Sequence, residues 1–129
     1  MAALYGDIIL EHFRHPRNYG TLPSPDIASE DFNPLCGDRI RIELKLHDGM
    51  VEVARFKGDG CAISRAAASI LTEMIQGESL ERAEGMNQEE LLSALKAEIR
   101  PSRIKCALLP LNALHAGIAA YRKVTPPPF

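Results

Sequence analysis

The 129-residue sequence has only three cysteines, no long run of apolar residues and no long run of charges of one sign. Because three is an odd number, a framework of disulfides is a poor explanation, and the thiols remain candidate free nucleophiles or metal ligands. The apolar runs are short, and no basic region followed by an apolar stretch opens the sequence. We therefore expect a cytoplasmic protein with neither a signal peptide nor a membrane span.

The charges are nearly balanced, with 15 Lys and Arg against 17 Asp and Glu. A net charge of -2 without a basic cluster argues against nucleic acid as a partner and favours a protein or an ion. Hydrophobic residues make up 46% and charged residues 25%, as in ordinary soluble globular proteins. We expect one domain over residues 1–129 with a normal core. No internal repeat is present.

The first half of the chain predicts one helix and one hairpin. Apolar residues recur at helical spacing until Pro16 ends the pattern after His15, and residues 17–31 are irregular, with room for one short strand. Residues 39–57 alternate between apolar and polar on both sides of Asp48-Gly49, which is a strong hairpin signal. The residues of the first helix that share its apolar face are Leu4, Ile8, Ile9, His12 and Phe13.

The second half predicts helices. Residues 62–76 form an alanine-rich pattern closed by Gly77, and Asn87 with Glu90 resembles a capping box for a shorter helix. A last helix extends to Tyr121, and we expect it to begin irregularly just after Cys106, because Pro110 is tolerated only near a first turn. The order of elements predicts an α+β fold, with a small antiparallel sheet of about three strands covered on one face by helices.

The three cysteines, Cys36, Cys61 and Cys106, all fall at predicted element boundaries. Their spacings of 25 and 45 residues exclude short Cys-x-x-Cys pairs, so any shared site must be assembled by the fold. Cys61 and Cys106 are expected at helix N-termini, which lower a thiol pKa. Three nearby cations, Arg39, Arg103 and Lys105, are expected to favour thiolates further.

Three thiolates together with Asp38 form a donor set of three sulfurs and one oxygen. Such a set suits tetrahedral zinc. It also suits an iron-sulfur cluster. A cluster with one carboxylate ligand would be easier to release than a cluster held by four cysteines. The simpler interpretations are that each cysteine is a small buried hydrophobe and that Asp38 is a turn residue. His12 joins the site only if the first helix packs over it.

Four stretches resemble the iron-sulfur cluster assembly scaffold family that includes IscU, SufU and the N-terminal domain of NifU. They are LYGDIILEHFRHPRNYG, NPLCGDRI, GDGCAISRAAAS and RIKCALLPLNAL, and they span nearly the whole chain in the family's order. The resemblance implies a compact α+β domain whose ligands are Cys36, Asp38, Cys61 and Cys106. It also implies that a cysteine desulfurase docks at this end and transfers a persulfide sulfur to one of these cysteines.

The resemblance leaves the subtype and the exact activity open. Lys105 stands where IscU proteins carry a histidine, the chaperone-recognised Leu-Pro-Pro-Val-Lys segment is missing, and the insertion of SufU proteins is missing as well. Our first hypothesis is a non-enzymatic scaffold that holds a transient [2Fe-2S] cluster for apoproteins or carriers. The second is a zinc-dependent sulfurtransferase, with Cys36 as sulfur acceptor and Cys106 as its rival. The third is a structural zinc domain that mediates protein contacts.

Overall fold

A computed structural model of the protein describes residues 6–124. Leu4 of the predicted first helix and the three prolines at 126–128 therefore lie outside the described residues. The chain runs through one N-terminal helix, a three-stranded sheet and four further helices. In order, the elements are α1 (Asp7–Arg14), β1 (Ile27–Asn33), β2 (Asp38–His47), β3 (Met50–Asp59), α2 (Ala62–Ile75), α3 (Leu80–Glu84), α4 (Gln88–Ala94), a 3-10 turn (Pro101–Arg103) and α5 (Ile104–Val124).

The sheet has the order β1-β2-β3, and both strand pairs are antiparallel. The hairpin predicted around Asp48-Gly49 is confirmed as β2 and β3, and both turn residues have positive φ, as a tight hairpin turn requires. β1 lies in the region that was expected to be irregular, where it pairs with β2 from Ile27 opposite Leu44 to Asn33 opposite Asp38. The register places the β1–β2 turn and the end of β3 at the same end of the sheet.

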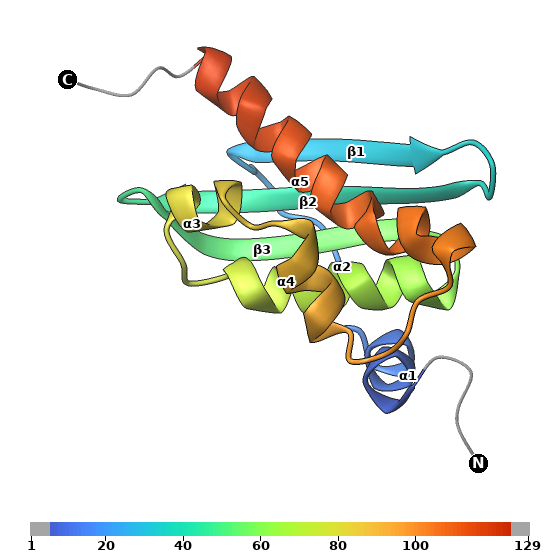
Figure 1. Ribbon diagram of the computed structural model, residues 1–129. Coiled ribbons are helices and arrows are strands. Elements are labelled where there is room, and N and C mark those ends of the chain that lie inside the picture. The colour runs from blue at the N-terminus through green and yellow to red at the C-terminus, as the bar shows by residue number, and fades with distance from the viewer. Residues whose placement is uncertain (1–5, 125–129) are drawn as a thin grey trace.

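The helices cover one face of the sheet, as predicted (Figure 1). α5 crosses that face, starting from the end of the sheet that carries the β1–β2 turn, which is called the site end below. Ile40, Ile42 and Leu44 of β2 are fully buried beneath them. The segment between α1 and β1 passes behind the sheet, on the face without helices (Figure 1). Its Leu22 N–H donates to Glu43 Oε1, which holds this crossing against β2.

Two expectations for the helices need correction. α5 begins at Ile104, so Cys106 lies in its first turn, and Pro110 lies inside the helix rather than at its start. The helix tolerates this proline because the apolar residues around it, from Cys106 to Leu111, are buried against the rest of the core. The short helix α3 was not expected at all. The capping box of α4 is confirmed, with Asn87 and Glu90 each bonding the other's backbone N–H.

By length and composition alone, the segment Pro101–Val124, which contains α5, is apolar enough to cross a membrane. In the folded chain, 56% of its most apolar window is buried inside the protein. Its apolar side chains belong to the core that they share with the sheet and with α2. A helix that is largely buried in a protein core can be as apolar as a membrane span, and burial accounts for the pattern here.

Gly117 is the point where α5 approaches β1 most closely. A Cβ at this position would lie 2.9 Å from Ile27 Cγ2 and 2.9 Å from Ser29 Cβ. Gly117→Ala should therefore destabilise the protein by about 1–3 kcal/mol, although alanine is the better helix former, because the helix would be forced away from the strand. Urea unfolding of the variant and the wild type measures the difference.

The matched control is Ala119→Ser, at an exposed position on the same helix. That substitution should change the free energy of unfolding by less than about 0.5 kcal/mol. A Gly117→Ala variant as stable as the wild type would show that α5 can shift away from β1 without cost.

Candidate metal centre

Three predicted ligands meet at the site end of the sheet. Cys36 lies in the β1–β2 turn, Asp38 is the first residue of β2, and Cys106 lies in the first turn of α5. Their ligand atoms all lie within 4.8 Å of one another, the only such group of possible metal ligands among residues 6–124. The two sulfur atoms of Cys36 and Cys106 are 3.7 Å apart, although 70 positions separate them in the sequence. The fold therefore assembles a site that no local motif could.

The turn that carries Cys36 is held by Asn33 at the end of β1. The Gly37 N–H donates to the Asn33 carbonyl at 2.8 Å, and the Leu35 N–H donates to Asn33 Oδ1 at 3.0 Å. Gly37 has a φ of +78°, a conformation that glycine adopts without strain. These bonds hold Leu35 and Cys36 outward, and Leu35 is 85% exposed. Sequence reasoning identified Cys36 but missed this large apolar side chain beside it.

Asp38 is buried with one carboxylate oxygen occupied and the other unused. Only 4% of the residue is exposed, and its Oδ1 accepts the Cys61 N–H at 3.2 Å. Oδ2 is buried and has no hydrogen-bond partner among the described residues. Gly60 makes room for the carboxylate, because a Cβ at that position would lie 2.9 Å from Asp38 Cγ. A buried carboxylate oxygen without a partner is the kind of atom that a cation would satisfy.

Cys61 stands apart from the other three residues. It is the N-cap of α2, as predicted, and its Sγ lies 3.9 Å from Ser64 Oγ rather than within the group formed by Cys36, Asp38 and Cys106. Ser64 is fully buried and donates to the Cys61 carbonyl at 3.1 Å. Sequence reasoning missed Ser64, although its position three residues after an N-cap could have drawn attention to it.

The thiol of Cys106 differs from expectation. Its position in the first turn of α5 was expected to lower its pKa, but burial, the hydrogen bond with Cys36 and the charges of Cys61 and Cys36 raise the pKa of Cys106 to about 12. Only a hydrogen bond from Arg103 opposes this rise. The expectation was wrong because only 2% of the residue is exposed, and desolvation of the thiolate outweighs the helix terminus. Metal binding would reverse this balance by replacing the proton.

The expected cations divide between the two faces of the sheet. Arg39 faces away from the site, where its guanidinium lies 3.6 Å from Glu30 and 5.0 Å from the ring centre of Phe32. Strand alternation explains this placement, since Asp38 points to the helical side. By contrast, Arg103 and Lys105 line an open groove whose lining also includes Cys36 and Cys106. Of the three expected cations, the two at the start of α5 therefore lie near the thiols and Arg39 does not.

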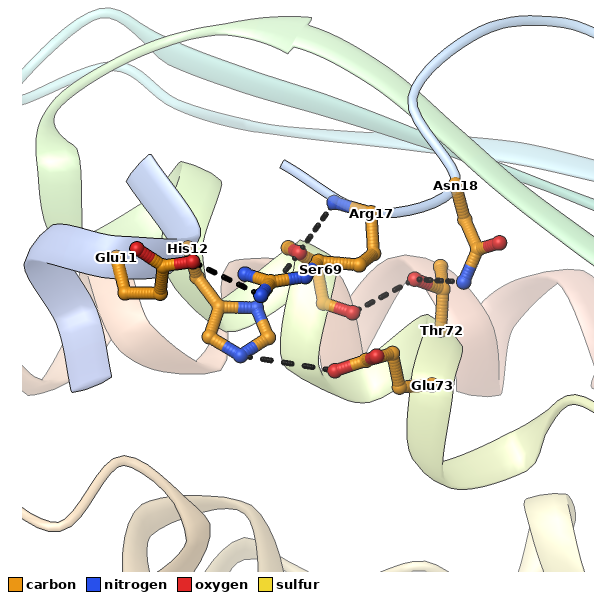
Figure 2. Close-up of polar contacts among 7 residues, drawn as sticks. All are labelled: Glu11, His12, Arg17, Asn18, Ser69, Thr72 and Glu73. Atoms are coloured by element: carbon orange, nitrogen blue, oxygen red, sulfur yellow. Dashed lines mark hydrogen bonds and ion pairs between the residues drawn. The ribbon is translucent and has the colours of Figure 1, made fainter. Parts of the chain in front are cut away.

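His12 is not at the site. Figure 2 shows it between α1 and α2, where His12 Nδ1 lies 2.8 Å from Ser69 Oγ and Nε2 lies 3.5 Å from Glu73. The Arg17 backbone N–H donates to the same Ser69 hydroxyl at 2.8 Å, and the Arg17 guanidinium pairs with Glu11. This cluster joins the first helix and the residues after it to α2. His12 therefore holds two helices together and is not a metal ligand here.

Burial and the nearby Arg17 charge lower the pKa of His12, and the carboxylates of Glu73 and Glu11 only partly oppose this effect. Because the folded state disfavours charged His12, the stability that neutral His12 contributes is complete above its ordinary pKa of about 6.5. It should be lost as the pH falls through the lowered pKa of the folded state. His12→Gln should flatten this part of the stability profile, measured by urea unfolding between about pH 7 and pH 5.

His47→Gln is the matched control, because it makes the same substitution at an exposed position of the hairpin, outside this cluster. A His12→Gln variant that loses stability with falling pH as steeply as the wild type would contradict this role for His12.

Comparisons with known proteins identify the family of this chain. Residues 4–126 match the model of the NifU-like N-terminal domain. The chain is 39% identical to the zinc-dependent sulfurtransferase SufU of Bacillus subtilis, with 90% of each chain covered. It is 34% identical to the iron-sulfur cluster assembly scaffold protein IscU of Escherichia coli K12, covering 92% of this chain and 94% of IscU.

A solved structure supports the fold. The N-terminal part of a nitrogen-fixing NifU-like protein from Brucella abortus superimposes with a TM-score of 0.74 at 21% identity, over 93% of this chain and 95% of that one. The identities to SufU and IscU, 39% and 34%, are close to each other, so they show the shared family and do not resolve the subtype. The protein belongs to the NifU N-terminal, IscU and SufU family of iron-sulfur cluster scaffolds.

Proposed function

We propose that this chain accepts sulfur from a cysteine desulfurase and holds a transient [2Fe-2S] cluster for transfer to apoproteins or carrier proteins. Cys36, Asp38, Cys61 and Cys106 are the ligands in this proposal. The same four residues hold a zinc ion when no cluster is present. The proposal further places this work in the cytoplasm, where thiols stay reduced.

One observation carries the proposal, namely the convergence of Cys36, Cys106 and the unused oxygen of Asp38. Two thiolates that bind one tetrahedral zinc ion at about 2.3 Å lie about 3.8 Å apart. The Cys36 and Cys106 sulfur atoms are 3.7 Å apart. Asp38 adds its buried Oδ2 atom, which makes no hydrogen bond within the described chain. The spacing and the donor types therefore suit a metal ion better than they suit simple core packing.

Cys61 completes the set by turning its side chain. Its sulfur makes one weak hydrogen bond within residues 6–124, with Ser64 Oγ at 3.9 Å. Its backbone is already fixed beside Asp38, because the Cys61 N–H donates to Oδ1. A change of rotamer about the Cα–Cβ bond moves Sγ without moving this backbone. The fourth ligand is therefore held close to the site before any metal binds.

The donor set supports temporary binding of the cluster. Thiolates are soft ligands that bind iron-sulfur clusters tightly, whereas a carboxylate is a harder and weaker ligand for them. An incoming thiolate from an acceptor protein can therefore displace Asp38 first. Zinc accepts three sulfurs and one oxygen in a tetrahedral site, and when bound it keeps the thiols deprotonated and ordered.

The surface beside the site suits a protein that delivers sulfur. Cys36 is exposed, so a donor persulfide can reach it, and Leu35 offers an apolar contact next to it. Arg103 and Lys105 line the adjoining groove and favour an approaching persulfide anion. These features support Cys36 as the first acceptor and Cys106, which is buried, as the less accessible rival.

The exposure of Cys36 also favours a second candidate, a zinc-dependent sulfurtransferase. In that case Cys36 leaves the zinc, takes the sulfur and passes it on, and no cluster forms. The 39% identity to SufU supports this alternative. A purely structural zinc domain is less well supported, because an exposed and accessible thiol is a poor choice for a permanent structural ligand.

Anaerobic reconstitution tests the scaffold function. The protein is incubated with iron, L-cysteine and a cysteine desulfurase, and the visible absorption of a [2Fe-2S] cluster is followed. We expect cluster absorption for the wild type and its loss in Cys36→Ser, because one of three thiolates is then missing. Zinc retained at one ion per chain, faster desulfurase turnover and no cluster would instead favour the sulfurtransferase.

A second prediction concerns Asp38. Asp38→Ala should bind the cluster and release it to a chelator several-fold more slowly than the wild type, because the most readily displaced ligand is gone. The decay of cluster absorption measures the rate. Asp26→Ala is the matched control, since Asp26 also accepts a backbone N–H, from Leu46, but lies at the opposite end of the sheet. Faster cluster loss from Asp38→Ala than from the wild type would contradict the role given to Asp38.

A further inference from the structure

We propose that Cys106 reduces the persulfide formed on Cys36, so that the chain releases sulfide using electrons from its own thiols. This inference rests on the proposed function, because it starts from sulfur accepted at Cys36. It assigns the two cysteines successive roles rather than rival ones. Cys36 receives the sulfur, and Cys106 then converts it to the oxidation state that an iron-sulfur cluster contains.

The distance between the two sulfur atoms supports a direct reaction. At 3.7 Å, Cys36 Sγ and Cys106 Sγ are in nonbonded contact, with no other atom between them. Cys61 is turned toward Ser64 and does not compete for the same position. Cys106 therefore lies next to the inner sulfur of a persulfide on Cys36 before any movement of the chain.

The reaction balances without an outside oxidant or reductant. The Cys106 thiol gives up its proton as its Sγ attacks Cys36 Sγ, and a bond forms between these two sulfur atoms. The bond from Cys36 Sγ to the outer sulfur breaks, and the outer sulfur leaves with the electron pair as hydrosulfide, which takes up the proton from the Cys106 thiol. The outer sulfur is reduced to sulfide, while the two cysteines are oxidised to a disulfide.

The geometry favours attack on the inner sulfur over transfer of the outer one. Cys106 is buried and approaches Cys36 from the protein side, whereas Cys36 is exposed on the groove side. An outer sulfur that extends from Cys36 into solvent therefore points away from the buried Cys106 thiol. Arg103 and Lys105 line this groove, and their positive charge favours departure of a hydrosulfide anion.

The product state has a clear consequence for the site. A disulfide between Cys36 and Cys106 removes two of the four proposed ligands, so the metal cannot bind again until a thiol reductant reopens the bond. Each release of sulfide is therefore followed by one external reduction. The exposure of Cys36 gives an external thiol access to this disulfide.

The test uses the full-length chain with a chelator present, so that both thiols are free of metal. Under anaerobic conditions, a catalytic amount of cysteine desulfurase and limiting L-cysteine are added without other thiols. We expect release of about one sulfide per chain, the yield set by one disulfide per sulfide. Peptide mass spectrometry should find a disulfide between Cys36 and Cys106.

The informative variant is Cys106→Ala, which keeps an apolar residue at this buried position. It should hold a stable persulfide on Cys36 and release sulfide more than about tenfold more slowly, until dithiothreitol is added. Ala119→Ser, on the exposed side of α5, should behave like the wild type. Circular dichroism confirms that each variant is folded. The persulfide on Cys36 is itself measured. A variant that still takes up sulfur at Cys36 but does not release sulfide has lost the chemical step and not the structure of the site.

Two results overturn the inference while leaving the proposed function standing. One is a wild type that keeps its Cys36 persulfide without releasing sulfide, and the other is a Cys106→Ala variant that releases sulfide at the wild-type rate. A wild type that takes up no sulfur from the desulfurase refutes the proposed function, and the inference with it.

Discussion

The hydrogen bond from the Cys61 N–H to the buried carboxylate of Asp38 joins the two halves of the site. It fixes the first residue of β2 against the first turn of α2, and a helix N-terminus is the electrostatically favourable place for a carboxylate. The remaining geometry follows from this junction. The turn before Asp38 carries Cys36, and Cys61 lies at the junction itself. α5 packs beside the sheet and α2, with Cys106 in its first turn.

The junction leaves Asp38 with one oxygen that makes no hydrogen bond to the described chain. A buried acceptor without a partner costs about 1–3 kcal/mol, so a fold selected only for stability has no reason to keep it. The nearby thiols add to this cost, because burial and mutual proximity disfavour the Cys106 thiolate. A cation at this position would offset both costs, so the electrostatics of the metal-free site favour cation binding.

Local signals in the sequence predicted the elements that depend on local chemistry. The Asp48-Gly49 pair predicted the hairpin, and Asn87 with Glu90 predicted the cap of α4. β1 was expected only as a possible short strand within residues 17–31, because it is an edge strand in which Ile27 alone is buried and its apolar pattern is weak. The start of α5 was misplaced because Pro110 resembles a helix start, whereas packing against the sheet carries the helix past it.

For the site, the resemblance of separated motifs implied the four ligands, and the structure brings three of them, Cys36, Asp38 and Cys106, together. The spacings alone could not have suggested this group. The properties that depend on three-dimensional burial were not predictable. The raised pKa of Cys106 comes from the core around α5, and the orientation of Cys61 comes from its contact with Ser64. Arg39 was assigned to the site by its position in the sequence, but strand alternation directs it to the opposite face.

The order of the elements along the chain has a consequence for synthesis. Cys106 follows Cys36 by 70 residues, and the helix that carries it also covers the buried face of the sheet. While the ribosome is still making α4, the part of the sheet that α5 covers has no partner, and the pair of facing thiols does not yet exist. Metal loading must therefore wait for α5 to leave the ribosome and dock, so a nascent chain cannot capture an ion in this geometry prematurely.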